Sequence, residues 1–248
     1  MGRPTVDALR VKIFADGADL NMIRHLAADS RIKGFTTNPT LMRAAGVSDY
    51  KAFARDVLDI VTDRPVSFEV FGDDFPIMQA QAQEIASWGK NVYVKIPITT
   101  TLGESAKQLI ATLSGAGIKL NVTAVMTLEQ VEIVAEALAP ETPAVVSLFA
   151  GRIADTGVDP VPHMQKAAAI LKHRPKAELL WASPRELLNI FQADAVGCHI
   201  ITVTPDVLKK LALVGKDLDS YSRETVEMFY RDAAVAGYGI EIAGSEVA

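Results

Sequence analysis

The stretch NVYVKIPIT, residues 91–99, decides the fold because it combines the pattern of a buried strand with a charge near its end. Its valines and Ile96 alternate with Tyr93 and Lys95, as expected for a strand whose two faces meet different surroundings. The β-branched residues suit a face that packs on helices. Lys95 then points to the opposite face, close to the carboxyl end, where Pro97 ends the strand.

Short apolar runs of this kind recur along the chain and alternate with segments of helical period. They predict strands at residues 11–15, 34–36, 66–71, 92–97, 118–123, 144–149, 177–182 and 198–203. Eight strand and helix units in 248 residues are typical of an α/β protein with a (β/α)8 TIM barrel, in which parallel strands close into a cylinder inside a ring of helices. A doubly wound open sheet is the competing fold, but FADGAD at 14–19 lacks the Gly-rich first turn that this fold favours.

Capping residues and prolines predict where the helices begin. These signals lie at Asp19, Pro39, Asp74, Thr101, Thr127, Pro160, Ser183 with Pro184, and Thr204 with Pro205. No linker rich in Pro, Gly or Ser divides the chain, which predicts one domain over residues 1–248. An additional C-terminal helix at 220–236 exceeds what a barrel needs, so it either caps one barrel end or packs on a neighbouring subunit.

The composition excludes several classes of protein. A formal net charge of −5 without basic blocks disfavours nucleic-acid binding. No apolar run is long enough to cross a bilayer and the first residues lack a signal-peptide pattern, so we expect a cytoplasmic protein without a membrane partner. The single cysteine, Cys198, and four scattered histidines show no ligand spacing. We therefore expect no metal and no other cofactor.

Polar residues on the inward face of the strands mark a candidate site. In the fourth strand this face carries Lys95, and in the third it carries Glu69. The same alternation pairs Phe14 with Asp16, Asn121 with Thr123, Val145 with Ser147 and Phe149, and Trp181 with Ser183. The polar members gather at the carboxyl ends of different strands, where active sites of barrels lie.

Each polar residue also has a purely structural interpretation. Asp16 could begin a turn, Ser183 could cap a helix, and Thr123 could bond the backbone. Lys95 and Glu69 could form a mutual salt bridge. An inward charge without a partner is costly, however, and the coincidence of these residues at one barrel end favours a catalytic site.

A lysine among apolar walls can act as a nucleophile. Burial disfavours the charged ammonium, so neutral amine becomes available to attack a carbonyl and form a Schiff base. The protonated imine then stabilises the carbanion left when a neighbouring carbon–carbon bond breaks. Asp16 and Glu69 can supply the acid and base groups that this chemistry with Lys95 requires.

A second group of residues predicts an anion site at the same end. Arg152 follows the sixth strand in SLFAGRI, and Ser183 and Arg185 lie in WASPREL, where the seventh strand gives way to a helix. Arginine side chains and a helix N-terminus bind phosphate well. Surface arginines are usually only solvated, an alternative that applies more to Arg185, but the position favours a sugar phosphate as the substrate.

The motifs FADGAD, GFTTNPTL, SFEV, YVKIP, LNVTAV, SLFAGRI and ASPRE occur in an order and spacing that resemble the transaldolase family, including its short branch with fructose-6-phosphate aldolase. The resemblance implies that Lys95 forms the Schiff base and that Asp16 exchanges a proton with the substrate C4 hydroxyl. It implies that Glu69 and Thr123 handle the water of imine formation. It assigns the dihydroxyacetone unit to Asn38, Asn121 and Ser147, and the phosphate to Arg152, Ser183 and Arg185.

Two positions help to choose within this family. The chain resembles transaldolases in having Glu69 and Phe149, where the aldolase branch has Gln and Tyr, although its length is more similar to that branch. We therefore expect transfer of a dihydroxyacetone unit between sugar phosphates, with an aldolase releasing free dihydroxyacetone as the alternative. A sugar-phosphate binding protein is a third hypothesis, disfavoured because every catalytic position is kept. The resemblance also implies a homo-oligomer in which 220–236 contacts a neighbour.

Overall fold

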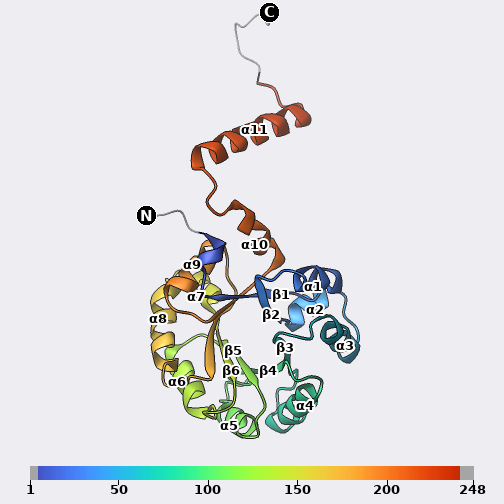
Figure 1. The fold of residues 1–248 in the computed structure, drawn as a ribbon, viewed down its shortest axis with the longest axis vertical. Helices are drawn as coiled ribbons and strands as arrows, with labels where there is room; N and C mark the ends of the chain where they lie inside the picture. The colour runs from blue at the N-terminus through green and yellow to red at the C-terminus, as the bar shows by residue number, and fades with distance from the viewer. Residues whose placement is uncertain (1–4, 241–248) are drawn as a thin grey trace, which may run out of the picture. The chain divides into compact units, whose positions relative to one another are not determined.

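The computed structural model describes residues 5–240, which divide into two compact units. The larger unit, Leu9–Leu211, is a closed barrel of parallel strands in which each strand pairs with the next and β8 pairs with β1. Figure 1 shows the strands at the centre and the helices outside them. The predicted (β/α)8 barrel is confirmed. Its strands are β1 (Lys12–Asp16), β2 (Ile32–Thr36), β3 (Val66–Glu69), β4 (Val92–Pro97), β5 (Leu120–Val125), β6 (Ala144–Leu148), β7 (Ala177–Trp181) and β8 (Ile200–Val203).

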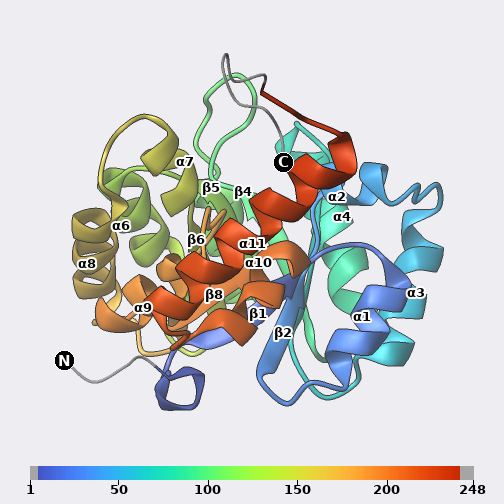
Figure 2. The same cartoon turned by 90° about the horizontal axis from the view of Figure 1, so that it is seen from above.

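Helices follow the strands along the chain, and Figure 2 shows α1, α3, α6 and α8 around the sheet. Their bounds are α1 (Leu20–Ala27), α2 (Pro39–Ala44), α3 (Tyr50–Ile60), α4 (Phe75–Ser87), α5 (Lys107–Gly115), α6 (Leu128–Ala137), α7 (Ala150–Asp155), α8 (Pro160–Leu171), α9 (Leu188–Ala195) and α10 (Pro205–Lys209). The short 3-10 helices are η1 (Val6–Ala8) and η2 (Lys210–Leu213).

Two predicted helix starts are wrong, and both errors lie in loops at the carboxyl end of the barrel. Thr101 belongs to a turn in which its amide donates to Asp73 at 2.7 Å, and α5 begins later, at Lys107. Ser183 has a φ of 55°, outside the extended region typical of an N-cap residue, and α9 begins at Leu188. The remaining starts agree with the structure, because Asp, Asn and Thr caps or first-turn prolines mark them.

Strand alternation places apolar residues on both sides of the barrel wall. The predicted helix-facing residues of β4 are fully buried or nearly so. On the inward face of several strands lies an apolar cluster, with Tyr93 and Phe149 packed against it. Its buried members are Phe14, Val145, Leu180, Ala182 and Ile200. Each large apolar side chain removed from water contributes about 1.5–3 kcal/mol to folding. This cluster fills part of the barrel interior with apolar side chains.

The face predicted for β7 is wrong. Leu180 and Ala182 belong to the inward cluster, so Trp181, which alternates with them, faces the helices. Ser183 nevertheless reaches the barrel mouth, because the chain leaves the pleat after Ala182 and turns with a positive φ. Ser183 thus lies at the barrel mouth as predicted, but for a different reason. The turn after Ala182 brings it there, not the alternation of side chains along β7.

The smaller unit contains η1 and the predicted C-terminal helix, α11 (Leu218–Ala236). Asp217 caps its first turn by accepting from the Ser220 amide at 3.0 Å, and Gly237 ends it with a φ of 68°. α11 contains no buried residue. Among residues 5–240, no helix combines the length and hydropathy of a membrane span.

Candidate active site

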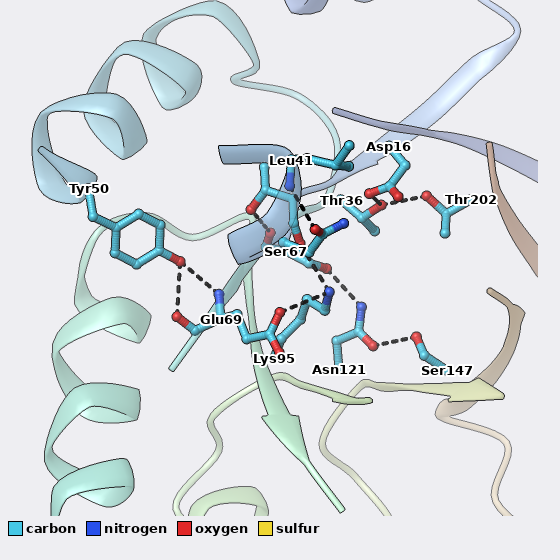
Figure 3. A network of polar contacts seen from close by, with 12 residues as sticks. Asp16, Thr36, Leu41, Tyr50, Ser67, Glu69, Lys95, Asn121, Ser147 and Thr202 are labelled. Carbon is cyan, nitrogen blue, oxygen red and sulfur yellow. Dashed lines mark hydrogen bonds and ion pairs between the residues drawn. The ribbon is translucent and has the colours of Figure 1, made fainter. Parts of the chain in front are cut away.

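A cavity of about 390 Å³ lies where the carboxyl ends of the strands meet. Parallel strands end at the same rim, so residues far apart in sequence converge there. Figure 3 shows several of these side chains turned toward one another. The cavity brings together the predicted site residues Asp16, Asn38, Glu69, Lys95, Asn121, Thr123, Ser147, Phe149, Arg152 and Ser183.

Lys95 lies on β4 with only 9% of its side chain exposed. Register pairs it with Glu69 on β3, and its Nζ lies 3.2 Å from Glu69 Oε2. The same Nζ donates to the Thr37 carbonyl at 3.0 Å. The salt bridge considered as a structural alternative is therefore present. A buried ion pair is weak evidence for stability, however, and this one borders a cavity, where an amine is within reach of a ligand.

Asp16 is the last residue of β1 and lines the cavity. The Thr36 hydroxyl donates to Asp16 Oδ1 at 2.8 Å, and the Thr202 hydroxyl contacts the Thr36 hydroxyl. Burial raises the pKa of Asp16 above its ordinary value, while the Lys95 charge and the Thr36 hydrogen bond offset part of that rise. A buried carboxyl whose pKa is raised is a suitable group to exchange protons with a ligand in the cavity.

A chain of buried hydrogen bonds crosses the floor of the site. The Ser147 hydroxyl donates to Asn121 Oδ1 at 2.6 Å, and Asn121 Nδ2 donates to Ser67 Oγ at 3.0 Å. These bonds fix the Asn121 amide, which is 1% exposed. Thr123 follows on the same face of β5, is 2% exposed and lines the cavity. The site thus offers positioned donors and acceptors for hydroxyl groups.

Asn38 lies at the start of α2, where its Oδ1 accepts from the Leu41 amide at 3.0 Å. The N-cap fixes the side chain at the cavity wall and commits its oxygen, so Nδ2 is the group suited to bind a ligand. The local sequence NPT explains this geometry, because proline favours the first helical position after an Asn cap.

The positive end of the cavity is built from α7 and the turn after β7. The Arg152 guanidinium lies 5.9 Å from the centre of the Phe149 ring, a cation–π distance. The Gly151 amide donates to the Ala182 carbonyl at 3.2 Å. This bond draws the turn carrying Ser183 against the start of α7, so that Ser183 and Arg152 line one wall.

Arg185 differs from the other predicted residues because it does not line the cavity. Its Nε donates to Asp155 Oδ1 at 3.0 Å, and its terminal nitrogen contacts Asp155 Oδ2. The predicted helix N-terminus is also displaced, since α9 begins at Leu188. Arg152 and Ser183 are therefore the positions of the predicted anion site that reach the cavity.

Sequence reasoning missed Thr36 and Thr202, which line the cavity beside Asp16. The signal was available, because both residues occupy the inward face of their strands near the carboxyl end. Threonine is common in strands for reasons of packing alone, so its hydroxyl attracts little attention in a sequence.

Comparison with known proteins identifies the family. Residues 13–240 match the family model described as Transaldolase/Fructose-6-phosphate aldolase. The chain belongs to this family. The resemblance inferred from the motifs, and with it membership of a transaldolase family of enzymes, is confirmed.

Several proteins named probable transaldolases are similar in sequence to this chain over most of its length. A relative from Dehalococcoides mccartyi is 34% identical, covering 81% of this chain and 90% of the relative. Relatives from Listeria monocytogenes and Streptococcus agalactiae are 32% and 33% identical, covering 86% of this chain and 95% and 97% of their own lengths.

Solved structures support the barrel assignment for this transaldolase-family chain. A monomeric dihydrodipicolinate synthase variant superposes with a TM-score of 0.58 at 12% identity, over 91% of this chain and 79% of that one. KGPDC from Streptococcus mutans superposes with a TM-score of 0.55 at 8% identity, over 80% and 90%. At these identities the likeness shows the fold alone.

Gly151 of the transaldolase-family chain allows the start of α7 to lie close to the turn that carries Ser183. A Cβ at this position would lie 1.5 Å from the Ser183 carbonyl oxygen, so Gly151→Ala must push the turn away. We expect it to lower the free energy of unfolding by about 1–3 kcal/mol and to raise KM for phosphorylated substrates at least about tenfold, since Arg152 and Ser183 separate.

Urea unfolding and steady-state kinetics measure both effects. Gly115→Ala is the matched control, because a Cβ there meets no atom within 4 Å. Unchanged stability and KM in Gly151→Ala would contradict the role assigned to this contact.

Proposed function

We propose that the chain is a transaldolase that transfers a dihydroxyacetone unit from a ketose phosphate, such as fructose 6-phosphate or sedoheptulose 7-phosphate, to an aldose phosphate. The observation that carries the proposal is the buried Lys95 amine, 3.2 Å from Glu69, in the cavity that also contains Asp16 and Arg152. A nucleophile, two carboxyl groups and a phosphate-binding cation then surround one substrate.

In the first step Lys95 passes a proton to Glu69, 3.2 Å away, and its amine attacks the C2 carbonyl of the donor; the same proton then goes to the departing oxygen. The carbinolamine loses its oxygen as water, leaving a protonated imine. Glu69 and Thr123 are the groups proposed to position this water and move its protons. The location of Glu69 beside Lys95 Nζ supports this role.

In the second step the bond between C3 and C4 breaks. Asp16 takes the proton of the C4 hydroxyl, the aldose phosphate leaves as an aldehyde, and the bonding electrons pass to the imine to give an enamine. The enamine then attacks the carbonyl carbon of the acceptor, and Asp16 returns the proton to its oxygen. Hydrolysis of the imine releases the new ketose phosphate and regenerates Lys95.

Substrate binding is assigned to the polar walls of the cavity. Asn38, Asn121 and Ser147 are proposed to hold the hydroxyl groups of the dihydroxyacetone unit, which the buried hydrogen bonds of Asn121 support. Arg152 and Ser183 are proposed to bind the phosphate. Arg185 joins them only if its guanidinium exchanges Asp155 for the ligand.

The second candidate is an aldolase that releases or uses free dihydroxyacetone. Phe149, which packs at the inner cluster and lines the cavity, favours transfer, because it has no hydroxyl to protonate the enamine. The deciding experiment supplies fructose 6-phosphate with and without erythrose 4-phosphate. We expect sedoheptulose 7-phosphate to form much faster than free dihydroxyacetone. Release of dihydroxyacetone at an equal or greater rate would favour the aldolase, and failure to form any imine in a single turnover would favour a binding protein.

The C-terminal helix is proposed to pack on a neighbouring subunit of a homo-oligomer. α11 contains no buried residue yet exposes Leu218, Val226, Phe229, Tyr230 and Val235. Exposed apolar side chains along one helix are typical of a surface that another chain covers.

Light scattering tests this proposal on a chain truncated at Leu218. We expect the mass to fall to that of a smaller species, whereas an unchanged mass would count against a role of α11 in assembly.

The cytoplasmic location expected from the sequence stays a prediction.

A further inference from the structure

The end of β3 lacks a complete strand partner. Along β2 and β3 the Phe35 amide donates to the Pro65 carbonyl and the Thr37 amide to the Ser67 carbonyl. If this parallel pattern continued by one step, the Glu69 amide would donate to the Thr37 carbonyl. The amide of residue 39 would in turn donate to the Glu69 carbonyl. Residue 39 is proline, which has no N–H, and the chain has already turned into α2.

Tyr50 supplies the bonds that the strand does not. Its hydroxyl accepts from the Glu69 amide at 2.7 Å and donates to the Glu69 carbonyl at 3.0 Å, as Figure 3 shows. Burial raises the pKa of Tyr50, which keeps the hydroxyl protonated and able to donate. One side chain thus satisfies both backbone groups of the residue that carries the carboxylate.

The Tyr50 ring is held as firmly as its hydroxyl. Ring centres lie 4.6 Å away at Phe71, 5.5 Å at Trp88 and 6.2 Å at Phe68. The last two are edge-on contacts, which are favourable for aromatic pairs. Tyr50 is the first residue of α3, whose N-cap fixes the helix end. The hydroxyl therefore has little freedom to leave Glu69.

The consequence reaches Lys95 through Thr37. The Thr37 carbonyl, which a continued ladder would use for the Glu69 amide, instead accepts from Lys95 Nζ at 3.0 Å. Lys95 Nζ then lies between this carbonyl and Glu69 Oε2. Because the Tyr50 hydroxyl hydrogen-bonds the amide and the carbonyl of Glu69, the Thr37 carbonyl is left to accept from Lys95 Nζ. Lys95 Nζ can then contact this carbonyl and the Glu69 carboxylate together.

We infer that Tyr50 is a positioning residue for the Lys95–Glu69 pair: it anchors the backbone of Glu69, keeps the carboxylate beside the amine and leaves the Thr37 carbonyl to hold that amine. The inference rests on the proposed Schiff-base function. It assigns Tyr50 no contact with substrate, since Tyr50 does not line the active-site cavity.

The test compares Tyr50→Phe, Glu69→Gln and the double variant. Tyr50→Phe keeps the ring contacts, so the barrel stays folded while both hydrogen bonds are lost. We expect the rate of imine formation with fructose 6-phosphate, followed by borohydride trapping from pH 6 to 9, to fall about tenfold. The pH dependence should shift toward that of Glu69→Gln, and in the Glu69→Gln background the added change should have almost no effect.

Tyr93→Phe is the matched control, because it removes a half-buried phenol lower in the barrel. A trapping rate and pH profile unchanged in Tyr50→Phe would overturn the inference, as would additive losses in the double variant. Hydrogen exchange at the Glu69 amide gives a readout that does not depend on activity, and we expect faster exchange in Tyr50→Phe. Failure of the proposed function is distinct, because the unsubstituted protein would then form no adduct.

Discussion

Lys95→Met is expected to reduce dihydroxyacetone transfer to the rate without enzyme, a loss of at least about 10⁴-fold, because the covalent route disappears with the amine. Methionine is close to lysine in length and is apolar, so it suits the buried position on β4. Glu69 loses its cation but borders the cavity, where water can solvate it. Coupled assays of sedoheptulose 7-phosphate formation measure the loss.

Lys107→Met is the control for Lys95→Met. Lys107 lies on α5, where its exposed side chain pairs with Glu136. Removing an exposed ion pair costs less than about 1 kcal/mol, and the rate should stay near that of the unsubstituted protein. Transfer by Lys95→Met above a few per cent of the original rate would mean that another group carries the intermediate.

Asp16→Asn is expected to separate the two halves of the reaction. Imine formation persists because Lys95, Glu69 and Thr123 are kept, whereas cleavage between C3 and C4 should fall about 10²–10⁴-fold without a base for the hydroxyl proton. Borohydride should then trap the uncleaved fructose 6-phosphate on the protein. A trapped three-carbon unit formed at the original rate would contradict the role of Asp16.

Asp16→Asn should also change how stability depends on pH. Because the pKa of Asp16 is raised in the folded protein, the folded state binds a proton that the unfolded state releases above the ordinary value of 3.8. Burying the ionised Asp16 carboxylate therefore lowers the free energy of unfolding. This loss is absent at low pH and grows as the pH rises from 3.8 toward the pKa of Asp16 in the folded protein.

Urea unfolding should accordingly show the stability of Asp16→Asn, relative to the unsubstituted protein, rising as the pH increases from 3.8 to 7. Asp59→Asn, an exposed change on α3, should show no such trend. Equal stability of Asp16→Asn and the unsubstituted protein across this range would show that Asp16 carries no cost of burial.

Much of the site follows from the period of a strand. Side chains alternate with a period of two, so placing the valines of β4 against helices sends Lys95 inward, and register then brings Glu69 beside it. The same rule brings Asn121 and Thr123 to the cavity. These residues could be predicted because the cause is local.

Other features depend on contacts between distant segments and left no local pattern. The turn at Ser183 depends on Gly151, and the pairing of Arg185 with Asp155 joins residues thirty positions apart. The role of Tyr50 depends on where β2 ends relative to β3. Asn38 was expected from the family resemblance, since a helix cap and a ligand contact look alike in sequence.

Borohydride reduction in the presence of fructose 6-phosphate, followed by peptide mass spectrometry, tests the central claim most directly. The account predicts a dihydroxyacetone adduct, stable to denaturation, on the peptide containing Lys95 and on no other lysine. An active protein that yields no adduct, or one modified at a different lysine, would contradict it.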